Sequence, residues 1–266
     1  AGALEATMRL LDHSPVDELR DPLNAAMRLA GELDRLDALV DELGKRAADD
    51  GRDPEARLAI AMAAAHAASD FLGDPDKALR VLVPLLEGEL ANLDACRRIE
   101  ELALRKDDVA LVERALEAGS KLALGNTDPA DQVAMLVRLG EARIKLNRLP
   151  GAVEAFREVL DLEPGSAEAI RGLVLVLDRS LAADPDAELP EGLLDALETA
   201  YHASNDSVGL ARLTRVRLRK VEGSDRMALL QTLGTLIDQG GGTSAESLDA
   251  WGALLALDGE ASHALE

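Results

Sequence analysis

The side chains that perform most enzymatic chemistry are few in this sequence and lie far apart. No histidine lies three or four residues from another or near the single cysteine, Cys96, as a metal site would require. Motifs for a serine or cysteine nucleophile are absent, and carboxylates are too numerous to mark an acid–base pair. We therefore expect no catalytic, metal-binding or cofactor-binding residues, and we expect Cys96 to be an apolar helix residue. The histidines are His13, His66, His202 and His263.

A glycine-rich run, Gly240–Ser244, superficially resembles a phosphate-binding loop. It lacks the Gly-Lys-Ser/Thr ending of such loops and falls between two expected helices rather than after a strand. We therefore predict a flexible turn in which Thr243 or Ser244 caps the next helix.

A cluster of six cations stands out in an otherwise acidic chain. Arg212, Arg215 and Arg219 share one helix face by their spacing, and one interpretation is a docking patch for an acidic partner. The alternative interpretation is that these cations pair with acids on adjacent helices. The other members of the cluster are Arg217, Lys220 and Arg226.

The composition excludes several classes of partner. The 266 residues include 29 Lys and Arg against 50 Asp and Glu, a net charge of −21, which repels nucleic acid and anionic membranes. The apolar stretches are far shorter than the roughly 20 residues that span a bilayer, so we predict no membrane insertion. A lone thiol fits the cytoplasm, which we favour, and also the periplasm. Because the chain begins Ala1-Gly2 without an initiator methionine, we expect a fragment of a longer protein.

The sequence predicts about fourteen helices and no strand. Apolar residues recur at helical spacing, and five Asp-Pro pairs, with prolines 22, 54, 75, 129 and 185, place a capping carboxylate before a proline that lacks an N–H. Asp34, Asp107 and Asp206 each predict a tight turn with a new helix beginning at the aspartate. The expected helices span 16–30, 33–48, 55–72, 75–87, 92–105, 109–124, 129–146, 151–162, 167–183, 191–204, 208–221, 225–239 and 244–257.

The segment 133–166 resembles a tetratricopeptide repeat of the degenerate type found in long bacterial proteins. Leu136, Leu139 and Gly140 fall on one helix face, and Pro164 closes the unit. The small Gly140 and Ala152 imply closely packed helices with Phe156 beside them, while Arg143 stands where a tyrosine is common. Such a helix-turn-helix unit cannot bury its apolar face alone and must stack on neighbours.

Two further blocks repeat this pattern less closely. Gly234 lies 94 residues after Gly140, and Trp251 lies 95 after Phe156, which fits a one-residue insertion in the glycine-rich turn. We expect Trp251 to pack in the core, with exposed stacking on a ligand as the alternative. A third block spans about 56–88. We therefore predict one repeat domain over 1–266, with units of roughly 16–90, 91–166 and 167–266.

The expected fold is an all-α solenoid of stacked antiparallel helix hairpins. The function implied by the resemblance is non-catalytic binding of a partner protein or peptide on the concave face of the inner helices. One alternative is a regulatory or substrate-recruiting domain of a larger enzyme, and another is an architectural subunit of a large assembly. The oligomeric state is left open. The candidate groove residues are Val137, Glu141, Lys145, Gln231 and Thr235, beside the cations of the cluster.

Overall fold

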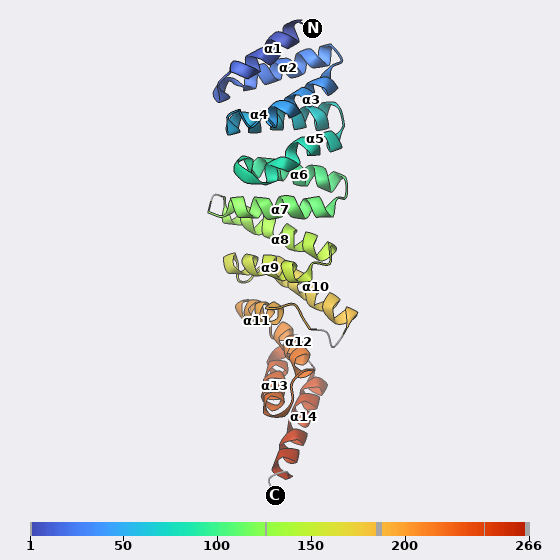
Figure 1. Cartoon of the computed structure of the whole chain (residues 1–266). Helices are drawn as coiled ribbons and strands as arrows, with labels where there is room; N and C mark the ends of the chain where they lie inside the picture. Colours follow the sequence, from blue (N-terminus) through green and yellow to red (C-terminus); the bar gives the residue numbers. More distant parts are fainter. Residues whose placement is uncertain (1, 126, 185–187, 242, 264–266) are drawn as a thin grey trace. The chain divides into compact units, whose positions relative to one another are not determined.

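The structure confirms an all-α fold. The computed structural model describes residues 2–125, 127–184, 188–241 and 243–263. Within these ranges it contains fourteen α-helices, five short 3-10 or π segments and no strand. The chain divides into two compact units, Ala1–Met135 and Leu136–Glu266. Helices that follow one another in the chain pack together within each unit (Figure 1). The predicted division into three repeat units stays a prediction.

The first unit contains seven complete helices, and the boundary between the units falls within an eighth. The helices are α1 (Gly2–His13), α2 (Arg20–Glu32), α3 (Leu36–Ala47), α4 (Pro54–His66), α5 (Pro75–Leu82), α6 (Leu93–Arg105), α7 (Val109–Ala123) and α8 (Pro129–Lys145). Short segments lie between them: η1 (Val16–Glu18), η2 (Ala67–Phe71), η3 (Val83–Leu86) and η4 (Gly88–Leu90).

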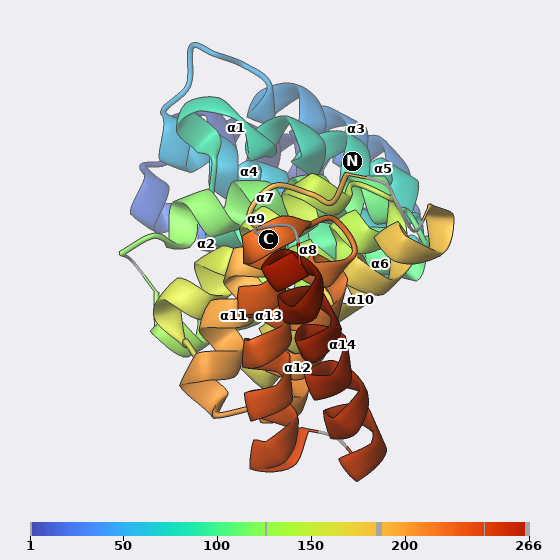
Figure 2. The ribbon, with the colours of Figure 1, turned by 90° about the horizontal axis from the view of Figure 1, so that it is seen from below.

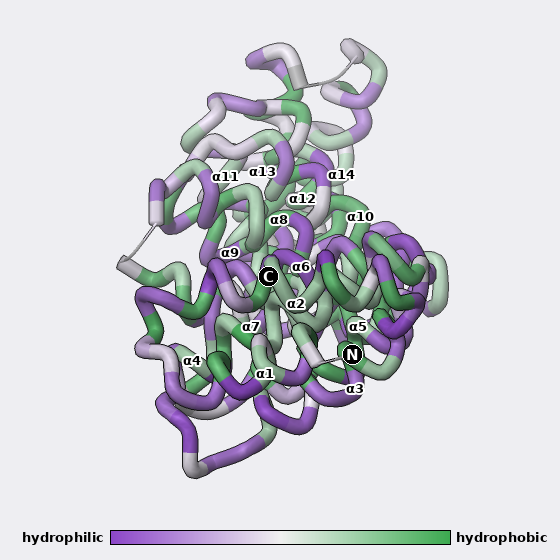
Figure 3. The backbone as a smooth tube through the Cα atoms, turned by 90° about the horizontal axis from the view of Figure 1, so that it is seen from above, coloured by the Kyte–Doolittle hydropathy of each residue, from purple (hydrophilic) through white to green (hydrophobic). Residues whose placement is uncertain are grey.

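The second unit holds the remaining six helices. They are α9 (Leu149–Leu162), α10 (Ala167–Ala183), α11 (Leu193–Ser204), α12 (Ser207–Leu218), α13 (Gly223–Leu236) and α14 (Ser244–His263), with η5 (Ile237–Gly241) between the last two. Hydrophilic and hydrophobic residues alternate along the helices rather than forming long apolar runs (Figure 3). This alternation is typical of helices that bury one face and expose the other.

Three of the five Asp-Pro pairs begin helices as predicted. Asp53, Asp74 and Asp128 accept hydrogen bonds of 2.9–3.1 Å from N–H groups in the first turns of α4, α5 and α8. The prediction is wrong for Asp21, because α2 already begins at Arg20 and no side chain caps it. The fifth pair falls at Pro185, outside the described residues.

Four tight helix turns share one backbone geometry. A single residue adopts left-handed φ angles of 53–58°, and the N–H of the next residue donates to the carbonyl five residues before it at 2.8–3.0 Å. These bonds satisfy carbonyls that the end of a helix leaves without partners. Aspartate and asparagine tolerate this conformation better than other side chains. The four residues are Asp34, Asp107, Asn147 and Asn205.

This geometry corrects two predicted helix starts. Asp34 and Asp107 do form the predicted tight turns, but the helices begin beyond them, α3 at Leu36 and α7 at Val109, as the predicted range 109–124 has it. Asp108 is the residue that caps α7, accepting a hydrogen bond of 3.0 Å from the N–H of Leu111. Asp206 does begin α12 as predicted and accepts from the N–H of Gly209 at 2.9 Å.

Two other boundaries differ from the prediction. Helix α1 was not predicted, although it buries Met8 and Leu11 in the core of the first unit. The expected helix 75–87 ends at Leu82 and continues as the 3-10 segment η3. Pro84 lies there, and its ring and missing N–H are incompatible with a continuing α-helix.

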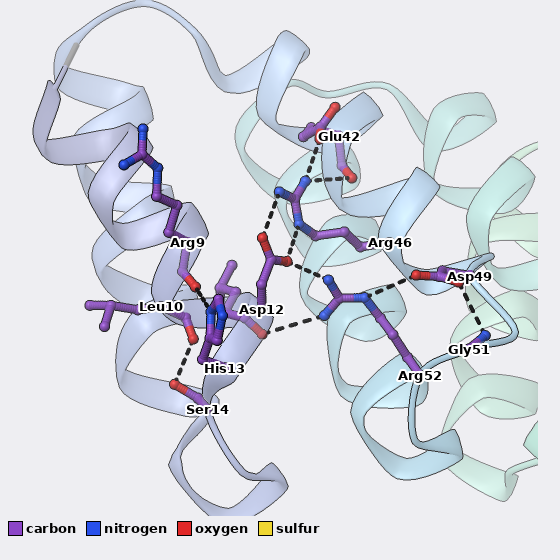
Figure 4. A network of polar contacts seen from close by, with 11 residues as sticks. Arg9, Leu10, Asp12, His13, Ser14, Glu42, Arg46, Asp49, Gly51 and Arg52 are labelled. Carbon is purple, nitrogen blue, oxygen red and sulfur yellow. Dashed lines mark hydrogen bonds and ion pairs between the residues drawn. The ribbon is translucent and has the colours of Figure 1, made fainter.

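A charged network joins the end of α1 to α3 and to the loop before α4 (Figure 4). Asp12 lies between two arginines: Arg46 Nε donates to its carboxylate at 3.0 Å, and Arg52 also pairs with it. Arg46 pairs in turn with Glu42, and Arg52 with Asp49. Burial alone would raise the pKa of Asp12, but hydrogen bonds from the two arginines outweigh it and lower that pKa below 3.8.

The depressed pKa of Asp12 predicts a loss of stability in acid. A carboxyl group whose pKa is lower in the folded state stabilises that state above its unfolded pKa, and this contribution disappears as pH falls through the folded value. We expect the melting temperature to fall below about pH 4, and Asp12→Asn to weaken this dependence. Thermal melts between about pH 3 and 7 measure it. Asp17→Asn is the control, because Asp17 is exposed and forms no ion pair within the described ranges. If the melting temperatures of the Asp12→Asn and Asp17→Asn variants depended equally on pH, Asp12 would not be the source of the loss of stability in acid.

Candidate partner-binding site

The sequence-predicted residues Glu141 and Lys145 lie together on the exposed side of α8 and line a cavity of about 400 Å³. The opposite wall comes from α10. Leu175 belongs to this wall and is 45% exposed, which is unusual for a large apolar side chain. The remaining lining residues are Ile144, Phe156, Glu168, Arg171, Gly172 and Arg179.

Phe156 lies at the base of this cavity, beneath its accessible surface. The ring is completely buried and projects from α9 between α8 and α10. A Cβ atom added at Gly140 would lie 2.5 Å from the ring, and one at Gly172 would overlap it even more closely. Glycine at both positions therefore lets two helices approach the same ring.

Charges of both signs surround the apolar base. Arg171 pairs with Glu168 at 3.2 Å, and Arg179 donates to the Ile144 carbonyl at the end of α8 at 2.7 Å. The pKa of Glu168 is lowered, first by a backbone hydrogen bond at its own position and then by Arg171.

Glu141 and Lys145 have no ion-pair partner among the side chains that the structure describes. The cavity thus offers one apolar surface, one available carboxylate and one available ammonium group.

The other predicted groove residues lie elsewhere. Val137 is on α8 but is half-buried and does not line the cavity. Gln231 and Thr235 are exposed on α13, where the Thr235 hydroxyl donates to the Gln231 carbonyl at 2.9 Å. The structure therefore brings together only two of the five predicted groove residues.

Sequence reasoning missed the wall that α10 contributes. Glu168, Arg171, Leu175 and Arg179 lie 34 residues after Ala134, Val137, Glu141 and Lys145 respectively. A constant offset of 34 residues therefore relates these α8 positions to the α10 positions that form the opposite wall. The 34-residue offset was present in the sequence. It was missed because α10 does not repeat the spacing of Gly140 and Phe156 that marks the segment 133–166.

The six cations of the basic cluster do not form one open patch. Arg212 pairs with Asp178 of α10, and Arg215 pairs with Glu246 of α14 at 3.1 Å. Arg217 pairs with Glu198 of α11 at 2.7 Å and with Asp195 at 3.3 Å. These pairs reduce the positive charge that an acidic partner would meet. Arg226 donates to the Leu218 carbonyl, Lys220 has its own partner, and Arg219 has no ion pair within the described ranges.

A larger cavity, of about 640 Å³, lies between α3 and α5 in the first unit. Two of its cations pair with acids: Lys77 contacts Asp37 at 2.6 Å and Asp41 at 2.7 Å, and Arg57 contacts Asp50 at 2.7 Å. Burial would lower the pKa of Lys77, but these hydrogen bonds outweigh it and raise that pKa. The smaller cavity is the better candidate because its wall exposes a large apolar side chain, Leu175, whereas the large apolar residues that line the larger cavity are buried or half-buried.

The single cysteine lies in the interior of the first unit. Cys96 is buried in α6, and burial raises the pKa of its thiol to about 11, so the nucleophilic thiolate is scarce at neutral pH. No cluster of three or more metal-ligating side chains occurs among the described residues. Among the same residues, no helix is both long and apolar enough to cross a membrane.

The glycine-rich turn caps the last helix, as predicted. The Thr243 hydroxyl accepts from the N–H of Glu246 at 3.3 Å, and the Glu246 carboxylate accepts from the N–H of Thr243 at 2.8 Å. This reciprocal pair is a capping box, which satisfies two N–H groups at the start of a helix.

Comparison with known proteins finds no match: no family model and no curated protein corresponds to the chain. The functional argument therefore rests on the geometry of the chain itself.

Proposed function

We propose that this chain is a non-catalytic scaffold that binds a protein or peptide partner in the groove between α8 and α10. The observation that carries the proposal is Leu175, an exposed leucine in the cavity above Phe156, with unpaired charges at the rim. A concave site with an apolar base and a few polar groups is the usual form of a binding pocket. Among the described residues, no cluster of three or more metal-ligating side chains occurs.

The resemblance to tetratricopeptide repeats and the 34-residue offset support a further part of the proposal. Helix hairpins would stack as a solenoid, and the walls on α8 and α10 would belong to its concave face. Four turns of identical backbone geometry support a repeated hairpin as the building unit. A degenerate array of this kind binds through a few positions of its inner helices, since the remaining positions serve packing.

The chemistry of the groove defines the ligand. An apolar side chain of the partner would contact Leu175, and this contact would remove apolar surface from water. A carboxylate of the partner would face Lys145, and a basic group would face Glu141. We expect a short segment that combines a large apolar residue with charges of both signs, not a uniformly acidic tail.

The test begins with capture of partners from an extract of the source organism and continues with the purified partner. Leu175→Ser combined with Lys145→Glu should weaken binding by at least about tenfold, because it removes the apolar contact and reverses the rim charge. The matched control is Leu104→Ser with Lys121→Glu, a similar pair of exposed residues in the first unit. Both variants should fold, since surface changes usually cost within about 0.5 kcal/mol each. Equal affinity for the two variants would reject the groove as the binding site.

A further inference from the structure

A further cavity, of about 490 Å³, lies between α1 and α3 in the first unit. Helix α2 packs against both of these helices (Figures 1 and 2). The five α3 positions that line the cavity have the same spacing as the five α10 positions that line the groove beside Leu175. A groove of the same construction therefore occurs in each unit. The α3 positions are 35, 38, 39, 42 and 46, and the α10 positions are 168, 171, 172, 175 and 179.

Two charged residues of this lining already have partners, because one end of the cavity lies beside the network of Asp12. Arg46 Nε lies 3.0 Å from the Asp12 carboxylate, and the same guanidinium group pairs with Glu42 (Figure 4). Glu42 also contacts Lys45 at 3.6 Å. Arg46 and Glu42 therefore compensate each other within the wall and offer little net charge to a ligand.

The other three charged residues of the lining have no ion-pair partner among the side chains that the structure describes. Arg9 and Glu5 come from α1, and Arg35 directly precedes α3; all three are exposed. Figure 4 shows the Arg9 guanidinium without a contact, and only the backbone carbonyl of Arg9 takes part in a hydrogen bond, with His13. The unpaired charge of the cavity is therefore two cations against one carboxylate.

The apolar part of the lining is small but accessible. Leu4 is half-buried and Ala38 is exposed, while Met8 and Leu39 lie beneath them in the core of the first unit. A cavity of about 490 Å³ is within the usual size range of ligand sites. The cavity thus combines an apolar patch with an unpaired arginine on each of its two walls.

These arginines indicate a ligand with carboxylate groups. A planar guanidinium donates two parallel hydrogen bonds to a carboxylate, a geometry that suits both unpaired arginines. The basic cluster of α12 lacks this property, because Arg212, Arg215 and Arg217 already pair with acids. The net charge of −21 opposes an acidic ligand at long range, so its affinity has to come from these short-range contacts.

We propose that the cavity between α1 and α3 binds an internal segment of a partner protein in which acidic residues flank one apolar side chain. The apolar side chain would contact Leu4 and Ala38, and carboxylates on either side of it would accept hydrogen bonds from Arg9 and Arg35. Glu5 would repel such a segment and limit its affinity. The cavity shares no residue with the groove between α8 and α10, so the two proposals succeed or fail independently.

The probe is a short synthetic peptide in which glutamates flank a single leucine, titrated into the full chain in a calorimeter. Its ends are blocked, so that only side-chain carboxylates are offered. We expect saturable binding, and binding about threefold weaker or more when the leucine is replaced by serine. A peptide with lysines in place of the glutamates should not bind detectably, because the arginines would repel it.

Matched variants of the chain separate this cavity from general attraction between charges. Arg9→Glu with Arg35→Glu should weaken binding at least about tenfold. The control is Arg20→Glu with Arg28→Glu, which changes the net charge equally at two exposed arginines of α2 outside the cavity that also lack an ion pair within the described ranges. Glu5→Gln should strengthen binding by about twofold to fivefold, a gain that misfolding does not produce.

Circular dichroism checks that each variant is folded. Equal affinity for the two double arginine variants would overturn the proposal, because the cavity would then not be the site. Equal binding of the lysine peptide, or no gain from Glu5→Gln, would overturn it as well, since neither result is compatible with recognition of carboxylates by the two arginines.

Discussion

Replacing Phe156 with alanine is expected to lower the free energy of unfolding by about 3–5 kcal/mol, the largest effect of any single substitution proposed for this chain. The side chain is completely buried and contacts helices on both sides of α9. Its removal leaves a cavity that α8 and α10 cannot close without moving toward each other. The loss combines the transfer free energy of the ring with the cost of that cavity.

The chain contains a natural control for this experiment. Phe71 is the only other phenylalanine and is 59% exposed, with its ring edge toward His66 at a centroid distance of 5.2 Å. Phe71→Ala removes the same atoms but should change the stability by no more than about 0.5 kcal/mol. Urea unfolding followed by circular dichroism measures both variants. A similar loss for the two would mean that Phe156 is not the packing centre of α8, α9 and α10.

Phe156→Ala also tests the groove. Because the ring lies at the base of the cavity beside Leu175, the variant should lose partner affinity even under conditions in which it remains folded. A variant that is destabilised but binds normally would separate the packing role of the ring from the binding role of the groove.

The helices were predictable because their signals are local. An aspartate before a proline, or a leucine every three or four residues, acts within one helical turn, and these signals placed the starts of α4, α5 and α8 correctly to within one residue. Asp34 and Asp107 were assigned as helix starts although they form the turns, because aspartate suits both a left-handed turn and a helix cap. In the pair Asp107-Asp108 one residue performs each role, and the sequence does not distinguish them.

The candidate site was harder to predict because it depends on two helices. Glu141 and Lys145 could be placed on an exposed face from their own repeat. Leu175 is part of the site only because Gly172 lets α10 approach Phe156, and that contact joins residues 16 positions apart in the sequence. The pairing of Arg212, Arg215 and Arg217 with acids likewise needed the positions of three other helices.

Replacing Gly172 is the second substitution that we expect to cause a large loss of stability. Gly172→Leu should destabilise the chain by about 1–3 kcal/mol or more, because even the first added carbon overlaps the buried Phe156 ring. Gly140→Leu should act in the same direction from the α8 side. The control is Gly252→Ala on α14, where an added Cβ meets nothing within 4 Å. That substitution should stabilise by up to about 1 kcal/mol through helix propensity alone.

A double-mutant cycle identifies the ring as the cause. In the wild-type background Gly172→Ala should destabilise, since its Cβ collides with Phe156. In the Phe156→Ala background the same substitution should become neutral or stabilising, because the obstacle is gone and alanine favours the helix by about 1 kcal/mol over glycine. The decisive result is that the effect of Gly172→Ala on the free energy of unfolding changes sign between the two backgrounds. The difference between the two values measures the coupling between α9 and α10 directly. If the stability effects of Gly172→Ala and Phe156→Ala were additive, the cost of Gly172→Ala would arise within α10 and not from contact with the ring. The ring would then not explain why two helices meet there.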